Sequence, residues 1–271
     1  MGQTERTECL IRDAVDAAAG AGRLITRPAD VVGGNLIDRR RFLLASGGTL
    51  SAALLAACNS YGPRSAGGIL RFAEGRNESV ERALFHAGAR DRPSRRAHDA
   101  GSQYPVYFIS DAIPMWDERA RGSWTLEISG LVGRTLRLTL DDLMRLPRTT
   151  QRVDHFCVEG WNAVASWTGV RLRELATVAQ ASPGARYVDF QSFDNDYHES
   201  WDIESALHPQ TLIAYGMDGS MLGAAHGAPA RVHSPVKLGY KNTKYLTRIV
   251  FMATRNGGYW SDQGYEWYGG T

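Results

Sequence analysis

The stretch HFCVEGWNAVASWTGVRL, residues 155–172, places Cys157 between aromatic residues and follows it with two tryptophans six residues apart. The commonest role of a free cysteine is that of a small buried hydrophobic side chain. A nucleophilic cysteine would need a base, and His155 lies two residues away, on the same face if this segment is a strand. A zinc site is not favoured, because the stretch holds no second cysteine and no cluster of histidines. The stretch alone therefore leaves a buried thiol, a nucleophile and a metal ligand as alternatives.

The composition of the chain is that of a folded globular protein. Of its 271 residues 43% are apolar and 10% aromatic, and the formal net charge is +2. Such a small net charge gives no electrostatic basis for binding nucleic acid. The lysines are confined to eight residues, at Lys237, Lys241 and Lys244. Such crowding indicates either an anion-binding segment or charges that protect a strand edge from aggregation.

The N-terminal part contains a segment typical of an export signal. Residues 39–58 read RRRFLLASGGTLSAALLAAC, in which arginines precede an apolar run that ends in small residues. The run is shorter than the about 20 residues that span a bilayer, and its order resembles a twin-arginine signal, which serves proteins exported already folded. The final Leu-Ala-Ala-Cys resembles a lipobox, so that Cys58 is expected to carry a lipid anchor.

These features divide the chain into three predicted parts. Residues 1–57 form a twin-arginine or lipoprotein-type signal, residues 58–101 a tether and wrapping segment with little periodicity, and residues 102–271 the functional domain. The expected location is the periplasm or the outer face of the cytoplasmic membrane. After removal of the signal only Cys58 and Cys157 remain, so a lipidated Cys58 would leave no partner for an internal disulfide.

The pattern of the functional domain predicts an α+β fold with a mixed sheet. Residues 123–133 alternate like a half-buried strand, and 136–140 are expected to pair with them. Thr139 is the expected N-cap of a short helix that stops at Pro147. A second helix is predicted over 169–180, with Val170, Leu172, Leu175 and Val178 on its apolar face. Further strands are predicted within 187–193, 229–236 and 244–252.

Beyond these patterns, the chain resembles the sulfite oxidase family of molybdopterin enzymes over roughly residues 104–268. In that family a cysteine that binds molybdenum is followed by Glu-Gly-Trp, a second Trp and Gly-Val-Xaa-Leu. The matching residues here are Cys157, Glu159, Gly160, Trp161, Trp167, Gly169, Val170 and Leu172. The resemblance implies a sulfite-oxidase-type molybdopterin-binding domain, with a thiolate as the soft donor that suits a metal also held by cofactor sulfurs.

The resemblance also assigns the remaining site residues. Cys157 is the implied catalytic metal ligand. The stretch HGAPARVHSPVKLGYKNTKYL, residues 226–246, matches the segment that grips the cofactor, whose phosphate requires cations and backbone N–H groups. The implied cofactor-binding residues are Ser192, His226, Arg231, Gly239, Tyr240 and Lys241. Trp161, Tyr240 and Trp267 are candidate walls of the pocket or plain core residues.

Departures from the family bear on the substrate. Many relatives carry Arg-Asn-His where this chain has Ser110, Asp111 and Ala112, and sulfite-oxidising members use that arginine for their anionic substrate. We also expect neither the dimerisation domain nor the haem domain that some relatives carry. We therefore expect oxygen-atom transfer with sulfoxide reduction favoured over sulfite oxidation, and a cytochrome or a membrane quinone-linked protein as redox partner.

Two other classes of protein stay open. A cofactor-free lipoprotein that binds a ligand on the same fold predicts a protein without molybdenum, in which Cys157→Ala is harmless. A cysteine hydrolase that uses Cys157 and His155 predicts inactivation by thiol alkylation in metal-free protein.

Overall fold

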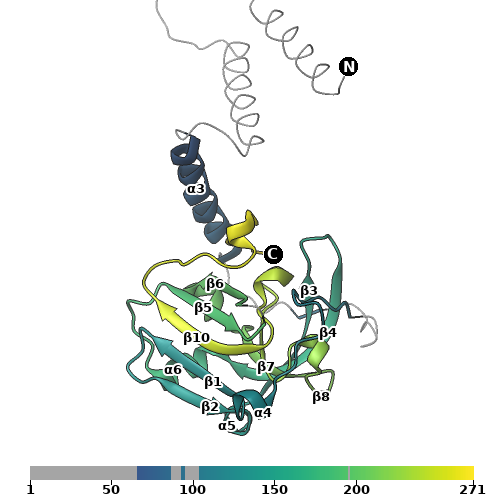
Figure 1. Ribbon diagram of the computed structural model, residues 1–271. Helices are drawn as coiled ribbons and strands as arrows, with labels where there is room; N and C mark the ends of the chain where they lie inside the picture. The colour runs from purple at the N-terminus through teal and green to yellow at the C-terminus, as the bar shows by residue number, and fades with distance from the viewer. Residues whose placement is uncertain (1–65, 87–92, 95–103, 195) are drawn as a thin grey trace, which may run out of the picture. The chain divides into compact units, whose positions relative to one another are not determined.

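The computed structural model describes residues 66–86, 93–94, 104–194 and 196–271 (Figure 1). Its helices are α3 (Ala66–His86), α4 (Glu118–Arg121), α5 (Leu140–Arg145), α6 (Leu172–Ala179) and α7 (Ile203–Ala206), with 3-10 turns η2 (Ala224–His226), η3 (Gly239–Lys241) and η4 (Ser261–Gln263). Its strands are β1 (Thr125–Gly130), β2 (Leu136–Thr139), β3 (Thr149–Phe156), β4 (Asn162–Arg171), β5 (Tyr187–Ser192), β6 (His198–Asp202), β7 (Leu212–Met217), β8 (Ser220–Met221), β9 (Arg231–His233) and β10 (Leu246–Met252). This mixture confirms the predicted α+β class.

The first sheet has the strand order β2-β1-β10-β5-β6. Strands β1 and β10 are parallel, whereas the other neighbours in this sheet are antiparallel. The predicted pairing of β1 with β2 is confirmed, with Leu126 opposite Leu138. Leu126 and Ile128 are buried while their neighbours along β1 are more exposed, so the alternation in the sequence reflects one face packed on the core.

The second sheet has the order β3-β4-β7-β8. Strand β8 pairs with the end of β7 at Gly216 and Met217, and β9 pairs with its beginning at Leu212–Ala214. Strands β3 and β4 form a long antiparallel hairpin from the pair Thr149 and Gly169 to the pair Phe156 and Asn162. Every residue of β7 is buried, so this strand runs through the interior. The loop of the hairpin, residues 157–161, carries the cysteine that the sequence singles out.

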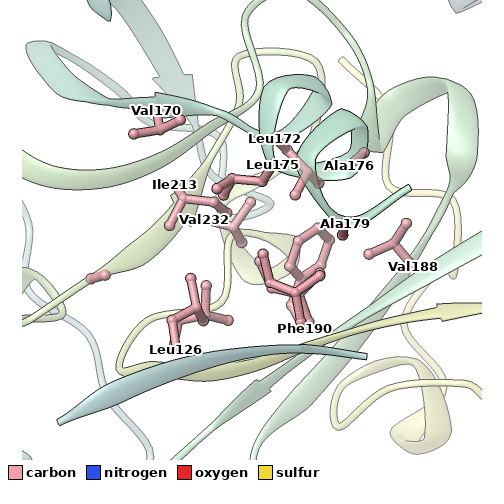
Figure 2. Packing of buried hydrophobic residues seen from close by; sticks show 14 of the residues in the cluster. Leu126, Val170, Leu172, Leu175, Ala176, Ala179, Val188, Phe190, Ile213 and Val232 are labelled. Atoms are coloured by element: carbon pink, nitrogen blue, oxygen red, sulfur yellow. The ribbon is translucent and has the colours of Figure 1, made fainter. Parts of the chain in front are cut away.

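The main hydrophobic core contains residues of both sheets and of α6. Figure 2 shows Leu172 and Leu175 pointing from α6 toward the space above Leu126 and Phe190, with Ile213 and Val232 beside them. Side chains of β1, β5, β7 and β9 therefore meet under one helix. A smaller cluster holds Tyr104, Val153, Ala163, Ala165, Trp167, Leu212, Ala214, Met217 and Leu222.

Strand β4 contributes to both clusters because its register shifts between Thr168 and Gly169. Trp167 belongs to the smaller cluster and Val170 to the main core. At Gly169 the backbones of β4 and β7 approach so closely that an added Cβ would collide with the carbonyl oxygen of Ile213. Glycine is therefore required at this position of the Gly-Val-Arg-Leu motif.

The second predicted helix is shorter than expected. Residues 169–171 belong to β4, and α6 begins at Leu172. Val170 is buried as a strand residue, and Val178 is 37% exposed, so neither belongs to a buried helical face. Val170 fits the helical spacing by coincidence, because a short apolar segment can match the repeat of a helix and that of a strand equally well. The predicted α5 is confirmed, with Thr139 and Asp142 forming a capping box.

Helix α3 lies in the segment for which the sequence predicts a tether with little periodicity. Contacts group residues 67–271 into one compact unit, so this helix is grouped with the domain. Arg82 binds Glu78 on the helix at 2.9 Å and Glu204 of α7 at 2.8 Å, and its guanidinium lies 5.8 Å from the ring centre of Tyr187. These contacts to distant residues are not visible in local sequence. Glycines inside the helix also lower its propensity.

The predicted signal, residues 1–57, and the candidate anchor Cys58 lie outside the described residues. In the part of the chain that is described, no helix has the length and apolar character needed to cross a membrane.

Candidate functional site

A cavity of about 360 Å³ opens beside the β3–β4 hairpin loop. Its walls come from five parts of the chain: the segment 104–109, the end of β3 with the hairpin loop, the three residues Ser192, Asp194 and Tyr197, residues within 226–245, and Trp260 with Tyr265. Six of the seven predicted site residues line it: Cys157, Ser192, His226, Arg231, Gly239 and Tyr240. Residues far apart in sequence thus meet around one space.

Cys157 is the first residue of the turn that joins β3 to β4. Its backbone N–H donates to the carbonyl of Trp161 at 2.9 Å, and its carbonyl accepts from the N–H of Gly160 at 3.1 Å. Gly160 has φ +90°, which favours glycine. The thiol is half-buried, and burial raises its pKa, so binding of a metal would release its proton.

The mouth of the cavity around the thiol is aromatic and acidic. Glu159 Oε2 lies 4.0 Å from Cys157 Sγ and accepts a hydrogen bond from the indole N–H of Trp161 at 3.0 Å. The ring of Tyr107 stacks on Trp161 with 5.8 Å between ring centres. The negative charge of Glu159 therefore adds to the effect of burial and raises the pKa of the Cys157 thiol further.

Arg231 is the buried cation of the cavity. Its guanidinium donates to the backbone carbonyls of Val232, His226 and Asn242 at 3.1–3.3 Å and lies 4.9 Å from the ring centre of Trp167. Within the described residues it forms no ion pair with a carboxylate, and burial lowers its pKa. A buried charge without a counter-ion is costly. The arginine is therefore prepared to receive an anion from the cavity.

Lys244 is a second cation on the cavity wall and is not among the site residues that the family resemblance implies. Its ammonium donates to the carbonyls of Tyr107 and Ala225. Burial and the charge of Arg231 lower its pKa to about 7, while Asp194 on the same wall opposes this shift. Asp194 in turn accepts a hydrogen bond from Ser110, which stands in the stretch where the resemblance places the substrate arginine of many relatives.

Lys241 is not among the residues that line the cavity. It is fully buried, and its ammonium binds Glu199 at 2.5 Å. Lys237 is likewise buried and binds Asp202 at 2.8 Å and the carbonyl of Tyr268 at 2.6 Å. Of the three clustered lysines, two thus form interior ion pairs and the third lines the cavity. The strand-edge explanation of the cluster is wrong for the two buried lysines.

The other predicted residues contact the cavity wall in different ways. The Ser192 hydroxyl accepts from the N–H of Asp194 at 2.9 Å. His226 packs edge-on against Tyr104, and burial lowers its pKa. The Tyr240 hydroxyl donates to the carbonyl of Glu266 at 2.5 Å.

The three candidate aromatic walls divide into two groups. Trp161 and Tyr240 line the cavity. Trp267 is an interior residue whose indole donates to Ser200 at 2.9 Å, so it is a core residue and not a wall.

The residues needed for a cysteine hydrolase do not form a dyad. His155 Nδ1 lies 3.3 Å from Nε2 of His233, and the structure records no hydrogen bond between His155 and Cys157, both of which are described. Burial, Arg231 and Lys244 lower the pKa of His155 to about 3, so its ring is neutral. This geometry gives no activated thiolate.

The side chains present fit a molybdopterin. Arg231 and Lys244 are two cations that can bind an anionic phosphate. Arg231 has no carboxylate partner among the described residues. One accessible sulfur, Cys157, offers the soft ligand that the metal requires. Among the described residues no group of three His, Cys, Asp or Glu side chains could hold a metal ion by itself. A metal here would be held by one protein sulfur together with the sulfurs of the cofactor.

Comparison with known proteins gives consistent matches. The model of the family described as oxidoreductase molybdopterin binding domain matches residues 112–260. A protein of Azospira oryzae named as a putative protein-methionine-sulfoxide reductase subunit YedZ1 is 41% identical over 176 residues, which cover 62% of this chain and 67% of that protein. The protein-methionine-sulfoxide reductase catalytic subunit MsrP of Ralstonia nicotianae is 34% identical over 144 residues.

The aligned region with MsrP covers 48% of this chain and 44% of that protein. This chain therefore spans two thirds of the first relative and less than half of the second. Among solved structures, the sulfane dehydrogenase SoxCD of Paracoccus pantotrophus is 25% identical with a TM-score of 0.46, over 48% of this chain and 38% of that one.

Proposed function

This chain belongs to the oxidoreductase molybdopterin binding domain family and is a molybdopterin-dependent oxidoreductase, and we propose that it removes the oxygen atom from sulfoxides, with methionine sulfoxide in proteins as the substrate class. The relatives that carry this substrate in their names support the proposal. Because the chain spans only part of those relatives, its substrate is argued from its own site as well.

The observation that carries the proposal is the charge at the mouth of the cavity. The carboxylate of Glu159 lies 4.0 Å from the thiol sulfur. Sulfite is an anion and would be repelled by this carboxylate. A sulfoxide is neutral and is not subject to this repulsion. The rings of Trp161 and Tyr107 beside Glu159 favour its apolar substituents.

The proposed reaction needs an external reductant that supplies two electrons. Reduction of a sulfoxide takes two electrons and two protons, breaks the S–O bond, and releases a thioether and water. The molybdenum cofactor supplies the two-electron oxygen-atom chemistry when it is bound.

The residues of this chain hold the cofactor and the substrate. Cys157 holds the metal through its sulfur, Arg231 and Lys244 hold the anionic part of the cofactor, and Trp161 and Tyr107 orient the substrate. The two protons come from solvent.

The electrons come from a partner protein, for which we propose a cytochrome or a membrane quinone-linked subunit. We place the enzyme in the periplasm or on the outer face of the cytoplasmic membrane. Arg39 and Arg40 would direct export of the folded protein, and a lipid on Cys58 would anchor it. Changing both arginines to lysine should retain the protein in the cytoplasm. Cys58→Ala should release it from membranes into the soluble periplasmic fraction, and recovery of that variant in the membrane fraction would contradict the anchor.

The substrate proposal is tested on purified enzyme in two directions. We expect a reduced viologen dye to be oxidised by methionine sulfoxide, free or in a protein, and we expect little reduction of ferricyanide by sulfite. Cys157→Ala, which lacks the metal ligand, is the control for both assays. Turnover of sulfite without turnover of any sulfoxide would refute the proposed direction.

A further inference from the structure

Two buried histidines stand side by side at the wall of the cavity. His155 of β3 lines the cavity, and His233 of β9 lies behind it with no exposed surface. Nδ1 of His155 and Nε2 of His233 are 3.3 Å apart. The His233 ring stacks on Trp167 with 4.1 Å between ring centres and 19° between planes. The position of the pair is therefore determined by packing.

The hydrogen-bonding needs of His233 decide where the protons of the pair lie. Its Nδ1 is buried and has no hydrogen-bond partner among the described residues. A proton on Nδ1 would be a buried, unpaired donor, which is rarer in proteins than an unpaired acceptor. Two buried rings in contact are neutral, so each carries one proton. The proton of His233 is therefore on Nε2 and is donated to Nδ1 of His155, which leaves the proton of His155 on its own Nε2.

That remaining donor lies on the cavity side. A Cβ added at Gly239, another wall residue, would lie 2.9 Å from Nε2 of His155. A side chain at this position would crowd the imidazole, so the glycine leaves room in front of the N–H. The donor has no partner of its own among the described residues, and the cavity is the direction from which an acceptor can approach.

We propose that His155 is a cofactor-binding residue that donates a hydrogen bond from Nε2 to an acceptor atom of the bound molybdopterin, and that His233 is the positioning residue that selects this tautomer. The acceptor is a ring nitrogen, ring carbonyl, sulfur or phosphate oxygen of the cofactor. His155 itself is held by ring contacts with Tyr104 and Trp161, 5.6 Å and 6.1 Å between centres. The inference depends on the cofactor and not on the sulfoxide substrate, so a failed sulfoxide assay would leave it intact.

The tautomers can be read directly in cofactor-free protein labelled with ¹⁵N-histidine. Long-range ¹H–¹⁵N spectra distinguish Nε2–H from Nδ1–H rings. His155→Phe and His233→Phe assign the two signals. We expect Nε2–H for both rings at neutral pH, and a mixture of tautomers for His155 in His233→Phe. An Nδ1–H signal from either ring in the wild-type protein would overturn the proposal.

Retention of molybdenum gives the second test. His155→Phe keeps a ring of similar size but loses the donor, whereas His155→Gln keeps an N–H donor. During dialysis we expect the phenylalanine variant to lose molybdenum at least tenfold faster than wild type, as measured by elemental analysis, and the glutamine variant to lie close to wild type. His208→Gln, at a buried histidine outside the cavity walls, is the control. Equal retention in His155→Phe and wild type would refute the role. Should His155→Phe fail to give a cooperative thermal transition, the tautomer measurement on wild type and His233→Phe decides.

Discussion

At the scale of single residues, the sulfur of Cys157 is the atom that we propose as the metal ligand. Cys157→Ser is expected to lower bound molybdenum at least tenfold, because a hydroxyl is a poor donor to a soft site. The side chain is half-buried in a turn held by backbone hydrogen bonds, so stability should change by less than about 0.5 kcal/mol. Elemental analysis and thermal unfolding of the same preparation separate the two effects. Wild-type molybdenum content in the serine variant would contradict the assignment.

The lowered pKa of Lys244 makes a second prediction, for cofactor-free protein. Its pKa is about 7 in the folded state and about 10.4 in an unfolded chain. Between these values the unfolded state binds more protons, so this residue makes the free energy of unfolding rise with pH. Lys244→Met removes the titration. The unfolding free energy of wild type minus that of the variant should therefore increase from pH 7 to pH 10, measured with urea.

The cofactor-loaded protein is the control for this pH effect. A bound anion beside Lys244 keeps the ammonium charged, so the difference between wild type and Lys244→Met should then vary less over the same range. A flat difference in the cofactor-free protein would show that the ammonium is solvated and not part of the cavity wall.

The residue types of the site could be predicted from sequence, but the direction of each side chain could not. Lys241 and Lys244 are three positions apart in one segment, and nothing in the local sequence indicates which of them lines the cavity. In the structure the side chain of Lys241 binds Glu199 of β6, whereas the side chain of Lys244 binds the carbonyl of Tyr107 at the cavity wall. Both partners are distant in the chain.

At the scale of elements, Gly169 is the position that allows β4 to cross close to β7. Gly169→Ala would press a methyl group into the carbonyl oxygen of Ile213, which neither strand can avoid without moving. We expect a loss of about 3 kcal/mol, at the upper end of overpacking costs, measured by urea unfolding. Gly223→Ala is the matched control, since nothing lies within 4 Å of its added Cβ and its φ is −76°. A loss in Gly169→Ala no larger than in the control would contradict the close approach.

Elements with a local signal can be predicted, and those determined by distant contacts cannot. The β1–β2 pair and α5 follow from alternation and from the capping box at Thr139. The helical spacing places the start of α6 too early, because Val170 is apolar as a buried residue of the strand. Helix α3 escapes prediction because its contact with Glu204 depends on tertiary structure.

At the scale of the whole molecule, the buried pair Lys237 and Asp202 joins the end of β6 to the C-terminal residues. Lys237→Met would remove the ammonium that binds the buried carboxylate of Asp202, which still accepts from the N–H of Ser205, and is expected to cost about 3 kcal/mol in unfolding free energy. Adding Asp202→Asn should recover more than half of that loss. Arg145→Met, which breaks an exposed pair with Asp142, is the control and should leave the unfolding free energy nearly unchanged.

The outcome that would contradict this prediction is a double variant as unstable as the single one. That result would mean that Lys237 acts through its contact with the ring of Tyr268, whose centre lies 3.5 Å from the ammonium, and not through its charge pair.

The cavity wall also sets an order of events during biosynthesis. Trp260 and Tyr265 line the same cavity as Cys157, and Trp260 is tied through its backbone N–H to Glu199 at 2.9 Å. On the ribosome the sulfur ligand emerges well before these two rings. A nascent chain thus presents the sulfur before the two rings that complete the wall, so the whole cavity can form only after translation has passed Tyr265.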